Sequence, residues 1–176
     1  MILHKFREHQ QNPDTEILIL GTFHPDVENG ADFYYGRPRN YLWQLLSNCF
    51  NQPSLKGQPL IQKQTFMQRY RIDFADIILT LDGIPADQEA NYGDAFIDQH
   101  VAEWHSTPAL IDSLPNIKAV YFTRKTFQGI PNIDQRISMI QNHCQHSDKR
   151  FGLLETPSRF ANQAKLNAWQ QVMGLN

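Results

Sequence analysis

Cysteine is scarce in this chain of 176 residues, and its two thiols, Cys49 and Cys144, limit the chemistry that it can carry. Two thiolates cannot hold a four-cysteine iron–sulfur cluster, and in a cytosolic protein they are expected to be free and buried. No apolar run approaches the roughly 20 residues that span a bilayer. The N-terminus carries charges too early and too often for a secretory signal. We therefore expect a cytoplasmic protein with no membrane partner.

Strong charge of one sign is also lacking, because 16 Lys and Arg residues stand against 18 Asp and Glu residues, for a net charge of −2. The whole surface cannot act as a basic DNA-coating module, so any nucleic-acid binding must rest on a local patch. The sequence has no Gly-x-Ser-x-Gly elbow, no Walker loop and no dinucleotide-binding Gly-x-Gly-x-x-Gly motif. A hydrolase or nucleotide-processing enzyme that acts on small molecules therefore has little support.

Apolar runs and helical periodicity alternate along the chain, with no repeat, low-complexity tract or linker. Strands are predicted at residues 17–21, 74–79, 117–122 and 151–155, and helices at residues 40–50, 60–70, 95–104, 108–114, 133–146 and 161–173. Residues 1–13 predict a short helix or an arm. Short apolar strands that alternate with helices imply a parallel sheet covered on both faces. The predicted fold class is α/β: one domain over residues 1–176, a three-layer α/β/α sandwich with a central four-stranded parallel sheet.

One stretch combines the features of a nucleotide site. The apolar residues 17–20 lead into Gly21, and a polar connector then joins them to an aromatic cluster, a basic turn and a helix start: Phe33, Tyr34, Tyr35, Arg37, Arg39 and Asn40. In open α/β sheets, ligands bind just beyond the carboxyl ends of the strands. Aromatic faces can stack on a base, and arginines can hold phosphate.

Three segments carry a family resemblance: Leu-Gly-Thr-Phe-His-Pro at residues 20–25, Tyr-Tyr-Gly-Arg-Pro-Arg-Asn-Tyr-Leu-Trp at residues 34–43, and Thr-Pro-Ser-Arg-Phe-Ala-Asn at residues 156–162. Together they resemble the uracil-DNA glycosylase superfamily, most closely its hypoxanthine (deoxyinosine) DNA glycosylase branch. The chain departs from that branch at residues 23–26, where Phe-His-Pro-Asp replaces the usual Pro-Gly turn. The resemblance implies a monofunctional DNA N-glycosylase of base excision repair, a hydrolase that needs no cofactor and acts as a monomer.

Asn40 and His24 are the candidate catalytic residues. The resemblance places the catalytic asparagine of the hypoxanthine branch at Asn40, whose side-chain oxygen could orient the attacking water. Asn40 is equally suited to cap the helix that follows, since asparagine is a favoured N-cap residue. His24 could act as an acid or contact the water, because the pKa of histidine can lie near neutrality. A solvated or structural side chain is the alternative for His24.

The candidate base-binding residues are Thr22, Phe23, Tyr35 and Asp76. Main-chain N–H groups of Thr22 and Phe23 could hydrogen-bond a base at the end of the first strand. Tyr35 is the ring expected to face an extruded base, while other rings of its triplet pack against the sheet. Asp76 stands inside an otherwise apolar strand, where a buried carboxylate needs partners. It could bind the base or cap a neighbouring loop.

DNA containing a damaged base is the predicted partner, with Arg37, Arg39, Ser158, Arg159 and Phe160 as candidate contacts. The arginines and Ser158 suit phosphate groups. Phe160 or Arg159 suits a wedge that fills the gap left by a flipped nucleotide. Phe160 could instead anchor its loop in the core.

No metal site is expected, because His143 and His146 share a helix face without further ligands at a telling spacing. One functional alternative stays open within the same fold: a divergent or non-catalytic relative that binds nucleic acid or a nucleotide. The altered turn at residues 23–26 and the acidic net charge favour it. The sequence does not identify the base that is excised, since uracil, hypoxanthine and xanthine differ in only a few hydrogen-bond donors and acceptors.

Overall fold

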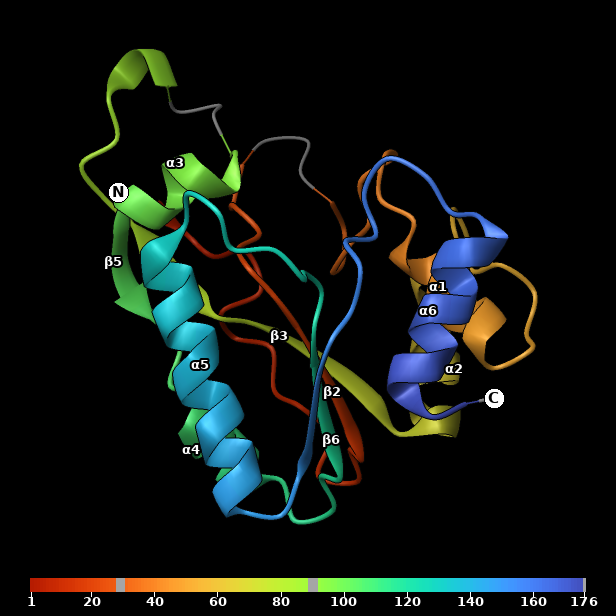
Figure 1. Cartoon of the computed structure of the whole chain (residues 1–176). Coiled ribbons are helices and arrows are strands. Elements are labelled where there is room, and N and C mark those ends of the chain that lie inside the picture. The colour runs from red at the N-terminus through yellow and green to blue at the C-terminus, as the bar shows by residue number, and fades with distance from the viewer. Residues whose placement is uncertain (28–30, 89–91, 176) are drawn as a thin grey trace.

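The computed structural model describes residues 1–27, 31–88 and 92–175, and it confirms the predicted α/β sandwich (Figure 1). Four parallel strands form the central sheet in the order β3-β2-β6-β7: β2 (Ile17–Gly21), β3 (Ile72–Asp76), β6 (Ala119–Phe122) and β7 (Arg150–Leu153). Ile17 of β2 pairs with Ile72 of β3 and with Ala119 of β6. Because the strands run in the same direction, their carboxyl ends meet at one edge of the sheet.

Two helical layers cover the sheet. Helices α1 (Leu42–Cys49), α2 (Leu60–Tyr70) and α6 (Gln163–Met173) lie on one face, and helices α3 (Asp94–Gln99), α4 (Thr107–Ser113) and α5 (Pro131–His146) lie on the other (Figure 1). Leu18 and Leu20 of β2 pack in the cluster with α5, and Ile19 packs in the cluster with α1 and α6. All three side chains are fully buried. Burial of each contributes about 1.5–3 kcal/mol, which explains why an uninterrupted apolar run marks this strand.

The strand predicted over residues 74–79 is corrected, because the chain leaves the parallel sheet halfway along it. β3 ends at Asp76, and the next residue, Ile77, donates its N–H to Gly21 O at 3.0 Å. The chain then enters β4 (Ile78–Leu81), which joins β1 (Ile2–Leu3) and β5 (Val101–Trp104) in an antiparallel sheet of order β1-β4-β5. Nearly all residues of the two strands are buried, and apolar residues stand on both sides of Asp76, so hydrophobicity alone does not mark the switch.

β5 also corrects the helix predicted over residues 95–104. α3 ends at Gln99, and the four residues of β5 are extended and pair with β4. Val101 and Trp104 are of types that favour strands. Residues 1–13 contain β1 and turns, so they form an arm and not a helix. A short 3₁₀ turn (Ala86–Gln88) lies between β4 and α3.

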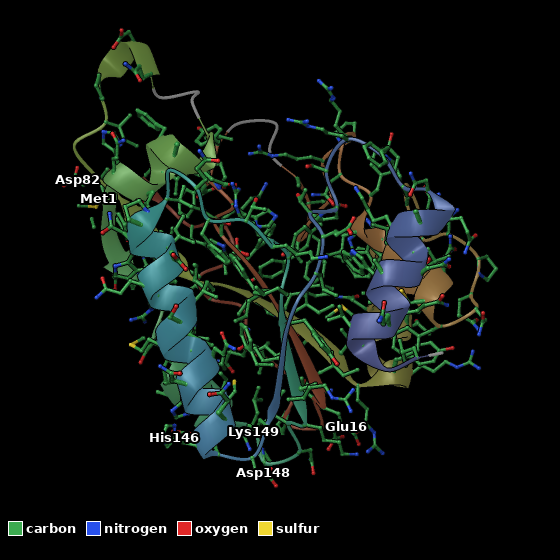
Figure 2. The ribbon with its side chains drawn as sticks, viewed as in Figure 1. Met1, Glu16, Asp82, His146, Asp148 and Lys149 are labelled. Carbon is green, nitrogen blue, oxygen red and sulfur yellow. The ribbon has the colours of Figure 1, made fainter. Side chains whose placement is uncertain are left out.

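The two edges of the central sheet carry different residues. Glu16, Asp148 and Lys149 lie at the edge where the strands begin (Figure 2). The opposite edge carries the loops that the sequence predicted to hold the site. Both cysteines are free and buried, as predicted. In the described part of the chain, no helix combines the length and the apolar character that crossing a bilayer requires.

Candidate active site

Two segments from distant parts of the chain meet at the carboxyl edge of the sheet. Asn40 and Ser158 form an isolated antiparallel bridge. Tyr41 donates its N–H to Pro157 O at 2.8 Å, and Arg159 donates its N–H to Arg39 O at 3.2 Å. The aromatic and basic turn and the late loop therefore lie side by side at this edge of the sheet.

A cavity of about 170 Å³ lies between these segments. Its walls come from Thr22, Phe23, His24, Tyr35, Arg37, Asn40, Asp94, Thr123, Arg124, Thr156 and Pro157. A cavity of about 150 Å³ is known to hold a benzene ring, so this one, named here the base cavity, has the size for one heterocycle. Of the predicted base-binding residues, Thr22, Phe23 and Tyr35 line it and Asp76 does not.

The hydrogen bonds of Asn40 determine which end of its amide faces a ligand. Asn40 Oδ1 accepts from Leu42 N at 2.9 Å, so the side chain supports the start of α1, although Tyr41 and not Asn40 occupies the N-cap position. The N–H of Leu42 can only donate, and this identifies the accepting atom as oxygen. Among the described residues, Nδ2 of Asn40 makes no hydrogen bond. Asn40 therefore offers the cavity two N–H donors and the second lone pair of Oδ1.

A buried carboxylate links two histidines behind the cavity. Asp76 Oδ2 is hydrogen-bonded to His24 Nδ1 and, at 2.8 Å, to His4 Nε2. The side chain of Asp76 is 0% exposed and that of His4 is 2% exposed. His4 belongs to the N-terminal arm and was not among the predicted site residues. The arm therefore contributes a side chain to the support of the site.

The second nitrogen of each ring fixes the position of its proton. Tyr35 N donates to His24 Nε2 at 3.0 Å, and Phe6 N donates to His4 Nδ1 at 3.1 Å. Each ring nitrogen that accepts must lack a proton, so the proton lies on the nitrogen that faces Asp76. Both histidines are thus N–H donors to the carboxylate. His24 lines the cavity, but it has no ring nitrogen left for a water, because both nitrogens are engaged with Tyr35 and Asp76.

His4, His24 and Asp76 also have the composition of a metal site, since their ligand atoms lie within 4.8 Å of one another. A metal would take the lone pair of the nitrogen that faces Asp76, and the other nitrogen would then carry the proton. That proton would point at the N–H of Tyr35 or of Phe6. The donor set therefore fits a carboxylate between two imidazoles and does not fit a metal ion.

The prediction that Asp76 binds the base is corrected by its burial. Burial favours a raised pKa, but the hydrogen bonds that His24 and His4 donate to the carboxylate outweigh it, so the pKa of Asp76 lies below its ordinary value. Its second oxygen, Oδ1, is buried without a hydrogen-bond partner in the described part of the chain. Asp76 therefore acts as an anchor for the two histidines. Of the two roles predicted from the sequence, capping a neighbouring loop is closer to this structural role than binding the base.

Tyr35 is the ring of its triplet that reaches the base cavity. Phe33 and Tyr34 pack in the core with Phe74, whereas Tyr35 lines the cavity and adopts a left-handed φ of 56°. Its hydroxyl lies 3.1 Å from Thr123 Oγ1, which donates to Leu20 O at 3.2 Å, so the Tyr35 hydroxyl donates to Thr123. Burial and the nearby Asp76 raise the pKa of Tyr35 well above its ordinary value. Tyr35 therefore stays neutral.

Gly21 is required by the close approach of Asp76 and Tyr35. A Cβ at this position would lie 2.3 Å from Asp76 Oδ1 and 2.5 Å from Tyr35 Oη. Gly21→Ala is expected to lower the free energy of unfolding by about 1–3 kcal/mol and to displace Tyr35. Urea denaturation measures the stability, and near-ultraviolet circular dichroism measures the change around the tyrosine ring. Gly129→Ala, where a Cβ meets open space at φ +77°, is the control and should leave that spectrum unchanged.

The late loop presents an exposed aromatic ring over a buried cation. Phe160 is 51% exposed, so it does not anchor the loop in the core. Arg159 has a left-handed φ of 74°, which a non-glycine residue adopts only under constraint. Lys165 Nζ donates to Thr156 O at 3.0 Å, Ser158 O at 3.3 Å and Phe160 O at 2.9 Å. The three ammonium protons thus hold the loop in shape.

Lys165→Met is expected to loosen this loop without unfolding α6. Three carbonyl groups lose their donor, which costs about 1–3 kcal/mol when such groups stay buried. The cap of α6 survives, since Asn162 Oδ1 accepts from Lys165 N and not from the side chain. Limited proteolysis should show faster cleavage within residues 156–160, with unchanged helical circular dichroism. Equal cleavage rates in the variant and the parent would contradict the role of Lys165.

Charged groups surround the mouth of the cavity. Arg37 and Arg39 are exposed, and the guanidinium of Arg37 lies 5.4 Å from the ring of Tyr92. Arg124 is paired with Asp94, and Arg124 Nε donates to Thr126 O at 2.6 Å. Asp94 is a cavity residue that sequence reasoning missed; burial raises its pKa, although Arg124 opposes the shift.

The fold that carries this cavity is that of the uracil-DNA glycosylases. The solution NMR structure of a candidate uracil DNA glycosylase from Methanosarcina acetivorans matches with a TM-score of 0.63, over 94% of this chain and 93% of that chain. The two sequences are 18% identical, so this similarity establishes the fold alone.

A relative by sequence agrees with the fold. The hypoxanthine DNA glycosylase of Methanosarcina barkeri (strain Fusaro / DSM 804) is 29% identical over 112 residues, which are 64% of this chain and 65% of that protein. The match thus spans just under two thirds of the relative. No family model matches the chain. The resemblance to the uracil-DNA glycosylase superfamily, and within it to the hypoxanthine branch, is confirmed.

Proposed function

We propose that the protein is a monofunctional DNA glycosylase that flips a deaminated base out of DNA and hydrolyses its N-glycosidic bond. The observation that carries the proposal is a cavity of about 170 Å³, the size of one heterocycle, which the Asn40 amide and the Tyr35 ring line together. The relative named hypoxanthine DNA glycosylase supports the same reaction class. Hypoxanthine, uracil and xanthine are the proposed substrates, and no cofactor is required.

The chemistry needs stabilisation of a departing anion. When the bond between the sugar C1′ and the base nitrogen breaks, its electron pair goes to the base, and positive charge develops on the sugar. Asn40 Nδ2 donates a hydrogen bond to the departing base, which strengthens as negative charge grows. A water attacks C1′ and loses its proton as the base gains one. The second lone pair of Asn40 Oδ1 accepts a hydrogen bond from that water.

The remaining walls recognise the base. Thr22 and Phe23 line the cavity at the end of β2, where their main-chain N–H groups are proposed to hydrogen-bond the base, and Tyr35 supplies the aromatic wall. His24 is a positioning residue, since it accepts from Tyr35 N and donates to Asp76. This arrangement holds the left-handed turn at Tyr35 in place before a substrate arrives.

DNA approaches across the late loop and the basic turn. Arg37, Arg39, Arg159 and Ser158 are proposed to contact phosphate groups, a sequence-independent attraction that weakens as salt rises. Phe160, already exposed, enters the base stack and fills the gap left by the flipped nucleotide.

An incision assay tests the proposal. The purified protein is given labelled duplexes and single strands that carry uracil, hypoxanthine or xanthine, and alkali then breaks any abasic site. Strand breaks at the damaged base are the expected result. One observation favours the non-catalytic alternative: among the described residues that line the cavity, the one carboxylate is Asp94, and Arg124 already neutralises it. Intact strands on every substrate, together with a gel shift, would establish that alternative.

A further inference from the structure

A second and larger cavity lies across the turn that carries Asn40. Its volume is about 620 Å³, and it shares Tyr35, Arg37 and Asn40 with the base cavity. Its other walls come from the start of α1, residues 54–58 and α2. A ligand group in this cavity would therefore lie next to a base held in the first one.

Lys63 of α2 lines this second cavity. The residue as a whole is 4% exposed, and its Nζ lies 5.5 Å from the centre of the Trp43 ring. Within the described residues, Lys63 Nζ makes no hydrogen bond and no ion pair, and it is not among the fully buried atoms that lack a partner. The stem of the side chain is therefore buried, while the ammonium group keeps access to the cavity and is free to meet an anion. Lys165, which is equally buried, has three carbonyl partners, so the isolation of Lys63 is not a general property of this protein.

A second lysine reinforces the positive charge of the cavity. Lys56 Nζ donates to Pro38 O at 2.6 Å and lies 3.4 Å from the centre of the Tyr41 ring. An ammonium carries three protons, so Lys56 keeps donor capacity for a ligand. Arg37 adds a third cation, and Asp32 is the one carboxylate among the described lining residues. The cavity thus carries a positive excess and fits an anion.

We propose that this second cavity binds a phosphate group, with Lys63 as its central contact and Lys56 and Arg37 around it. The inference rests on the proposed function in one respect: the phosphate belongs to the DNA strand that carries the flipped nucleotide. A free phosphate offers the same chemistry, so the tests distinguish the two sources. Lysine suits this task because it meets a phosphate as a compact point charge.

The salt dependence of DNA binding tests the inference. Affinity for an oligonucleotide with an uncleavable abasic analogue is measured across a range of salt concentrations. Each phosphate contact contributes about 0.9 to the slope of log affinity against log salt for a duplex, and about 0.7 for a single strand. Lys63→Met should lower the slope by that amount, and Lys63→Arg should retain it. Lys149→Met, at the opposite edge of the sheet (Figure 2), should not change it.

Chemical protection in the unaltered protein gives a second test that does not depend on a variant folding. Acetylation of Lys63 and of Lys149 is followed by mass spectrometry, alone, with inorganic phosphate, and with the abasic oligonucleotide. Protection of Lys63 by the oligonucleotide, with Lys149 unprotected, supports a strand phosphate. Protection by inorganic phosphate in a protein that binds no DNA supports the anion site and rejects the proposed function. An unchanged slope in Lys63→Met and equal acetylation under all conditions would overturn the site and leave the proposed function standing.

Discussion

Replacing Asn40 with aspartate is expected to lower the rate of base release by about a hundredfold to a thousandfold, while the fold stays intact. Aspartate keeps an oxygen for Leu42 N, the partner of Asn40 Oδ1 at 2.9 Å, so the start of α1 keeps its support. It offers no N–H donor to the departing base, and its charge opposes the negative charge that develops there. Single-turnover rates with enzyme in excess over substrate measure the chemical step.

Comparison of Asn40→Asp with Asn40→Ala separates the two functions of this side chain. Alanine removes the donor and the cap together, so the rate should fall by a similar factor, and stability should fall by about 1 kcal/mol as well. DNA affinity in a gel shift should stay near that of the parent in both variants. Near-normal base release by the aspartate variant would contradict the donor role. It would favour instead the role that the sequence indicated, in which the side-chain oxygen orients the water.

Asp76→Ala is expected to lower the free energy of unfolding by about 2–6 kcal/mol, because two buried N–H donors lose their acceptor at a cost of about 1–3 kcal/mol each. The substitution leaves His24 Nδ1 and His4 Nε2 without their shared acceptor inside the core. Base release should also fall, because His24 no longer holds the N–H of Tyr35. Urea denaturation measures the stability, and single-turnover rates measure the activity of the folded fraction.

Asp73→Ala is the matched control for this variant. Asp73 is a buried carboxylate of the same strand; its Oδ1 lies 2.7 Å from His9 Nε2, and its Oδ2 accepts from Asn12 N at 2.9 Å. Its loss should destabilise the protein, but it should leave the base-release rate of the folded fraction unchanged, since Asp73 does not line the base cavity. A parallel loss of activity in both variants would show that general destabilisation explains the effect.

The dependence of stability on pH follows from the lowered pKa of Asp76. The unfolded chain binds a proton at the ordinary value of 3.8, and the folded chain binds it at a lower pH. The stability that Asp76 contributes is therefore complete above that ordinary value, and it is lost as the pH falls toward the folded-state pKa. Asp76→Asn, which keeps an acceptor oxygen, should flatten the decline in stability below about pH 4. Identical acid profiles for the parent and this variant would contradict the assigned shift.

Local patterns in the sequence predicted much of the fold. The helix predicted over residues 60–70 has the observed bounds, because its limits are set by local residues: a preceding proline and a left-handed Arg71 at the C-cap. The first loop and the late loop could be expected at the same edge because each follows a strand, and parallel strands bring their carboxyl ends to one edge. Tyr35 was separable from Phe33 and Tyr34 because it directly precedes Gly36, where the turn leaves the core.

Contacts between distant residues could not be predicted in the same way. His4 lies 72 positions before Asp76, and nothing in the arm signals that its imidazole enters the core. The position of Asp76 in an apolar strand indicated that its carboxylate needs hydrogen-bond partners, but it did not indicate which residues these are. The change from the parallel to the antiparallel sheet after Asp76 could not be predicted, because buried strands of both kinds are rich in apolar residues. Lys63 gave no signal, since a lysine on a helix is ordinarily solvated.

The bridge between Asn40 and Ser158 has a consequence for synthesis of the protein. A growing polypeptide that has not yet reached the segment around Ser158 lacks one wall of the cleft, whatever the state of its earlier elements. The complete cleft would then form late, when that segment docks against residues made much earlier. Prematurely terminated fragments would consequently lack the proposed activity.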